Sequence, residues 1–128
     1  MKFLCLCHYA LDAFERFTPD DFQRMQAICE PQDRALRASG ALWAVGSLAT
    51  PEQFRSLKAR RGQPLAIEDA PYQPTPEPFG AFFIIEAADM DEATRIARLH
   101  PGTHLAELCD GGIEIRPIDL LEFSTPTA

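Results

Sequence analysis

The stretch that most constrains the fold is 69–86, a proline-rich loop that leads into the most apolar run of the chain. Four prolines fix the φ angle of the loop and remove backbone donors, so it can form neither a helix nor an inner strand. Gly80 then precedes 82–85, a run typical of a buried strand. We expect a stiff loop over the end of a core strand, with polar side chains held above a pocket.

The composition indicates one globular domain over residues 1–128. The net charge of −7 argues against nucleic acid and membrane as partners, because both attract basic surfaces. The sequence has no signal-peptide pattern and no apolar run near the ~20 residues that span a bilayer. We therefore expect a cytoplasmic protein.

The cysteines and histidines predict neither a disulfide nor a metal site. Cys5, Cys7 and Cys29 lie in apolar stretches, where free thiols behave as small hydrophobic side chains. His100 and His104 are close in sequence, but an intervening Pro-Gly pair prevents them from stacking on one helix. We expect no metal and no cofactor.

The first half of the chain predicts a strand, a helix and a second strand. The apolar run 2–9 is strand-like, and Thr18 followed by proline and two aspartates is typical of a helix start. Pro31 should kink or break this helix near Glu30, and a second segment, 31–39, should end at Gly40. The run 41–49 is again strand-like, and its Trp43 is expected in the core with the phenylalanines.

The second half predicts a hairpin, a strand, a helix and a last strand. The hairpin turns at 61–63, and the strand 81–86 follows the proline loop. Asp89 begins the second helix with a capping box, and a Pro-Gly pair ends it. The segment 113–118 alternates and ends in proline, as an edge strand does.

The element order predicts an α+β fold, the ferredoxin-like split βαβ arrangement with a β-hairpin insertion. Two helices can cover only one face of such a sheet, yet the three strands at 3–7, 42–48 and 82–85 carry apolar side chains on both faces. We expect a second copy to cover the other face. The chain is therefore predicted to form a homodimer, with a pocket between helices and sheet or near the dimer seam.

The run 69–82, DAPYQPTPEPFGAF, matches without a gap a motif that reads approximately DGPFAETKExLGGF. The helix entry 89–93 and the closing run 113–118 fit as well. On these residues the chain resembles the YCII-related proteins, as a divergent member of the branch named for its DGPF motif. The resemblance covers nearly the whole chain and implies a dimeric α+β barrel.

The resemblance also implies a His–Asp pair in a pocket, which this chain does not have at the usual places. The family's helix histidine falls at Cys29, and its aspartate before a proline falls at His100. The lysine and the first glutamate of the motif are Pro76 and Pro74 here. These departures lower the expectation of the same chemistry.

His100 is the main catalytic candidate, as an acid or base oriented by Asp69 or Glu77. The alternative is a helix-end histidine that bonds free carbonyls. The two carboxylates could instead accept backbone N–H groups within turns. Candidate pocket residues are His8, Tyr9, Cys29 and Tyr72. Cys29 is either a nucleophile activated by a histidine or a thiol that fills space.

Two functions follow from these residues. The favoured one is a non-catalytic dimeric module that binds a small molecule or regulates a partner. The alternative is a small-molecule enzyme with lyase, isomerase or dehalogenase-like acid–base chemistry at His100. Fold analogy alone does not decide between them.

Overall fold

The centre of the structure is a four-stranded antiparallel sheet in the order β2-β5-β1-β6. The strands of this computed structural model, which describes residues 1–124, are β1 (Lys2–Tyr9), β2 (Leu42–Ser47), β5 (Phe79–Glu86) and β6 (Gly111–Pro117). This order is that of the ferredoxin-like fold, so the predicted α+β, ferredoxin-like arrangement of the chain is confirmed. The last strand, β6, lies at an edge as predicted. The last four residues of the predicted single domain lie outside the described part.

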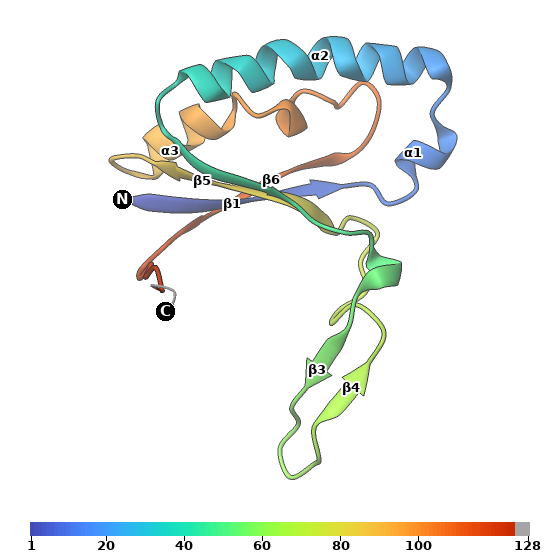
Figure 1. Cartoon of the computed structure of the whole chain (residues 1–128). Helices are drawn as coiled ribbons and strands as arrows, with labels where there is room; N and C mark the ends of the chain where they lie inside the picture. The colour runs from blue at the N-terminus through green and yellow to red at the C-terminus, as the bar shows by residue number, and fades with distance from the viewer. Residues whose placement is uncertain (125–128) are drawn as a thin grey trace.

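The helices lie on one face of the sheet (Figure 1). They are α1 (Ala13–Arg16), the long α2 (Pro19–Ala38) and α3 (Met90–Ala97). Between this layer and the sheet lies the core, where Phe3, Leu36, Phe83 and Ile85 are almost fully buried. The inner strands β1 and β5 therefore carry most of the core.

The long helix α2 begins as the sequence predicts but does not break where expected. The Thr18 hydroxyl accepts the Asp21 N–H, and the Asp21 carboxylate accepts the Thr18 N–H, which completes a capping box. Pro31 lies inside a continuous helix, so the predicted break is wrong. Pro31 and Ala27 are both exposed, and water can therefore bond the Ala27 carbonyl that a proline leaves without a donor.

The helix α3, which is the second of the two predicted helices, begins at the predicted residue. The Asp89 carboxylate accepts the Glu92 N–H at 2.8 Å, which is the N-cap half of the predicted capping box. The helix ends before a short 3₁₀ turn, Pro101–Thr103, that directs the chain back toward the sheet. This turn places His100 against the core.

The face of the sheet opposite the helices is apolar. Leu4 pairs with Ile84 and Leu6 with Phe82, and these four side chains point away from the core residues Phe3 and Phe83. Within the described residues no helix covers this face (Figure 1). We call it the bare face.

Trp43, predicted to lie in the core, is 57% exposed. A register irregularity between Leu42 and Ala44 places Trp43 at the edge of the bare face, with the Lys2 ammonium 4.1 Å from the centre of its ring. The prediction is therefore wrong for a single copy of the chain. The ring packs under a cation instead of among apolar side chains.

 The predicted hairpin forms a separate two-stranded sheet of β3 (Ser56–Lys58) and β4 (Ala66–Glu68). Gly62, in the turn of this hairpin, has a φ of 74°, and Gly40, the predicted end of α2, has a φ of 77°. Both glycines adopt the left-handed conformation that other residues rarely reach. We call residues 54–72 the arm, because they project away from the main sheet on its helix-free side (Figure 1).

None of the helices in residues 1–124 is long and apolar enough to cross a membrane.

Replacing Pro31 by Ala tests the account of α2. The change stabilises the folded state, because it restores a backbone donor inside the helix and removes a residue that opposes helix formation. It also has a smaller destabilising effect, because the unfolded chain loses the restriction that proline imposes. We expect the free energy of unfolding to rise by about 1–3 kcal/mol in a denaturant titration. Arg34→Ala, an exposed change on the same helix, should alter it by less than about 0.5 kcal/mol. A less stable Pro31→Ala variant would contradict this account.

Candidate functional site

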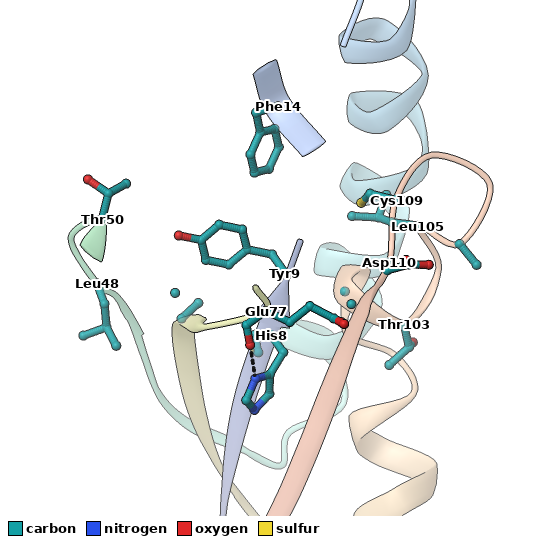
Figure 2. Close-up of a pocket in the computed structure, with 16 residues that line it drawn as sticks. His8, Tyr9, Phe14, Leu48, Thr50, Glu77, Thr103, Leu105, Cys109 and Asp110 are labelled. Atoms are coloured by element: carbon teal, nitrogen blue, oxygen red, sulfur yellow. Dashed lines mark hydrogen bonds between the residues drawn. The ribbon is translucent and has the colours of Figure 1, made fainter. Parts of the chain in front are cut away.

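A cavity of about 710 Å³ opens where β1 ends. Its walls come from the ends of β1 and β2, the start of β5, α1 and the loop that precedes β6 (Figure 2). The loop is tied to the strand end by the Ala10 N–H, which donates to the Asp110 carbonyl at 3.0 Å. Three predicted site residues, His8, Tyr9 and Glu77, line this cavity.

Tyr9 is held in the cavity by its neighbours. Its ring lies 6.1 Å from that of Phe14, and both rings face the cavity in Figure 2. A Cβ atom added to Gly80 would lie 2.6 Å from Tyr9 Cε1, so the ring occupies the space that this glycine leaves open. Only glycine permits this approach of the ring to β5.

His8 has a defined tautomer. Its Nδ1 lies 2.8 Å from the Glu77 carbonyl oxygen, which can only accept, so Nδ1 carries a proton (Figure 2). In the neutral ring Nε2 is then an acceptor. The edge of the ring packs against Phe79 at 5.8 Å.

The charged groups of the cavity are carboxylates. Glu77 and Asp110 both line it, and among residues 1–124 neither side chain forms an ion pair. In the described part of the chain no lysine or arginine lines the cavity. Most of the remaining wall is apolar, and it includes Phe14, Leu48 and Leu105.

His100 lies outside this cavity, half-buried against the core. Its ring stacks on Phe83 with centroids 4.7 Å apart, and its Nδ1 accepts the Gly102 N–H at 2.9 Å. Nε2 lies 3.7 Å from Cys7 Sγ. Burial lowers the pKa of His100, the Asp33 charge opposes this shift, and His104 adds to it. Because Nδ1 is an acceptor, the neutral ring carries its proton on Nε2.

The carboxylate near His100 is Asp33, which the sequence did not single out. Asp33 and His100 line a second cavity of about 360 Å³ between α2 and β2. Asp33 also forms an ion pair with Arg37 at 3.0 Å. The two predicted partners of His100 lie elsewhere, since Glu77 lines the larger cavity and Asp69 belongs to the arm.

The structure does not bring Asp69, Tyr72 and Cys29 to the larger cavity. Asp69 accepts from Arg55 at 2.7 Å, and the Tyr72 hydroxyl accepts from Arg60 at 3.3 Å, both within the arm. Cys29 is half-buried on α2. Its pKa is raised by burial and by Asp33 and Cys109, so this thiol has no activating cation and is protonated at neutral pH.

The cysteines of β1 are protonated too. Burial raises the pKa of Cys5 to about 12 and that of Cys7 to about 11. All four cysteines are free. Within residues 1–124 no group of three or more His, Cys, Asp or Glu side chains is arranged to hold a metal ion.

The cavity also contains residues that sequence reasoning missed. Phe14 lies on α1, a helix of only four residues, and Asp110 lies in an irregular loop. Neither belongs to a periodic pattern, so no local signal identifies them. The space around Gly80 was a usable signal, because a glycine next to an apolar strand often marks a close approach.

The sequence matches the YCII-related domain over residues 1–121. The chain belongs to the YCII-related family. This match confirms the resemblance at family level. No curated protein matches the sequence. Among solved structures, the chain is similar to 5-chloro-2-hydroxyhydroquinone dehydrochlorinase (TftG) from Burkholderia phenoliruptrix AC1100, in complex with 2,5-dihydroxybenzoquinone.

That likeness has 22% identity and a TM-score of 0.37, covering 89% of this YCII-related chain and 91% of the dehydrochlorinase. At this TM-score it carries no argument about activity. The fold of the YCII-related chain is therefore established by its own strand order.

The state of His100 predicts a pH dependence of stability. Burial lowers its pKa below the ordinary value of 6.5, so the unfolded chain binds more protons than the folded one near that pH. Its contribution is present above pH 6.5 and is lost as the pH falls through the folded-state pKa. His100→Asn offers an oxygen to the Gly102 N–H but cannot titrate.

Denaturant titrations of both proteins at about pH 8 and about pH 5 measure this contribution. We expect the wild type to lose more stability on acidification than His100→Asn. Equal losses would show that His100 is not held in its neutral form.

Proposed function

We propose that this chain is a non-catalytic small-molecule-binding module of the YCII-related family. The observation that carries the proposal is the 710 Å³ cavity at the end of β1, in which Tyr9 is held beside Gly80. A cavity of this size suits a small organic ligand. His100, the main catalytic candidate, lies outside it, with Nδ1 accepting the Gly102 N–H and its ring stacked on Phe83.

The lining favours a particular ligand chemistry. Aromatic and aliphatic side chains provide an apolar wall, and His8 Nε2 and the two carboxylates provide acceptors. An anion would meet Glu77 and Asp110 without a compensating cation from the described residues, which costs free energy. The cavity thus favours a neutral or cationic molecule with an aromatic or aliphatic body and at least one hydrogen-bond donor.

Membership of the DGPF branch and a homodimer are parts of the same proposal. The run 69–82 retains the spacing of the branch motif. The bare face carries the half-buried Leu4, Phe82 and Ile84 with the exposed Trp43 at its edge, and a second copy packed face to face would complete their burial. Such a dimer is the α+β barrel that the resemblance implies. Four free cysteines fit a cytoplasmic location.

One observation favours a second candidate, an enzyme with acid–base chemistry. His100 and Asp33 line the same smaller cavity, and the charge of Asp33 opposes the lowering of the His100 pKa. A carboxylate that stabilises an imidazolium is a common element of proton transfer. In this scheme Asp33 replaces Asp69 and Glu77 as the orienting partner.

A panel of three aromatic probes of similar size tests the binding proposal by thermal shift. We expect benzylamine and benzyl alcohol to raise the Tm with increasing concentration, because they bind the native state. Benzoate should leave it unchanged, since it brings a negative charge to two carboxylates. If none of the three raises the Tm, the cavity is not the binding site proposed.

Two glycine variants locate any binding. Gly80→Ala should displace the Tyr9 ring and weaken the Tm shift given by benzylamine. Gly112→Ala is the matched control, because nothing lies within 4 Å of the added Cβ. Equal shifts in both variants would place the ligand away from Tyr9.

The enzyme candidate is tested by an NMR titration of His100. Removing the Asp33 charge in Asp33→Asn should lower the pKa of His100 further below its ordinary value, because that charge raises it. Arg34→Asn, a charge change on the same helix, serves as the control. An unchanged pKa in Asp33→Asn would remove the proposed acid–base pair.

A further inference from the structure

We propose that the arm, residues 54–72, binds a second copy of this chain. The inference goes beyond ligand binding and rests on the proposed homodimer, to which it adds a contact separate from the bare face. It is carried by the exposure, charge and position of the arm.

The arm has an apolar face that no other part of residues 1–124 covers. Leu57 pairs across the two strands with Ile67, so both side chains point to the same side of the ribbon. They are 57% and 64% exposed, and Leu65 beside them is 55% exposed. A ribbon of two strands alone is only marginally stable in water, so this face needs a cover.

On the opposite face of the hairpin, the polar and charged side chains find their partners within the arm. Lys58 forms an ion pair with Glu68 at 3.0 Å, and the Lys58 and Arg60 cations lie 5.6 and 5.7 Å from the centre of the Tyr72 ring. Ser56 is buried and donates to the Ala70 carbonyl. One face is thus complete, and the Leu57–Ile67 face remains open.

Charge identifies the occupant as a second copy. The arm carries four cations against two carboxylates, a net charge of +2, and this leaves −9 on the rest of a chain whose total is −7. The cations are Arg55, Lys58, Arg60 and Arg61, and the carboxylates are Glu68 and Asp69. The arm is therefore complementary to the body of another copy, and salt should weaken the contact.

The position of the arm also indicates that a second copy of the chain is its partner. The arm extends on the side of the sheet that the helices leave open (Figure 1). A copy seated on the bare face lies on that same side, within the space beside the arm. In a twofold dimer each chain then provides one arm and receives one, which enlarges the interface beyond the sheet faces.

The test measures dimer dissociation by analytical ultracentrifugation for the wild type and for the double variant Leu57→Thr, Ile67→Thr. Threonine retains β-propensity, and both positions are exposed in the single chain, so the fold should persist. We expect the dissociation constant of the dimer to rise at least about tenfold. Met90→Thr, an exposed position on the helix layer, is the matched control and should leave it unchanged.

A photo-crosslinking amino acid in place of Leu57 provides a second readout, and we expect it to join two copies. A wild-type dimer with an unchanged dissociation constant in the double variant overturns the arm contact and leaves the face-to-face dimer standing. Crosslinks only within one chain have the same meaning. A wild type that sediments as single copies overturns both the arm contact and the homodimer.

Discussion

The structure of residues 1–124 depends on a sheet whose helices all lie on one side. The inner strands β1 and β5 place Phe3, Phe83 and Ile85 beneath two helices, and this single layer supplies the core. The alternation that directs these residues inward directs Leu4 and Phe82 to the other face. A chain with this pattern cannot bury all its apolar surface alone, so fold and assembly follow from one constraint.

Much of the fold was predictable because its signals are local. Strand alternation and helix caps depend on neighbouring residues, and Thr18, Asp89 and Gly40 mark their boundaries as expected. The continuity of α2 through Pro31 was not predictable, because the penalty for a missing donor depends on whether water reaches the free carbonyl. Sequence alone does not show that this side of α2 faces solvent. The exposure of Trp43 likewise depends on a register irregularity in β2 that no local sequence pattern encodes.

The site was predictable only where strand pairing determines position. His8 pairs with Phe79, so the end of β1 and the start of β5 meet, and His8, Tyr9 and Glu77 come together. Asp69 is only eight residues before Glu77, yet the direction of the arm separates them. The orientation of a hairpin insertion depends on packing beyond its own residues. Asp33 was missed because its relation to His100 is entirely tertiary.

The cavity and the arm share a structural element. Leu48 and Glu77, which line the cavity, stand where the chain leaves the main sheet for the arm and where it returns. The Leu48 N–H donates to the Gly80 carbonyl at 2.9 Å, which ties the departing strand to the glycine beside Tyr9. Fixing the arm against another copy would therefore order one wall of the cavity before a ligand arrives. A wall ordered in advance lowers the entropic cost of binding, so assembly would strengthen ligand binding without a new ligand contact.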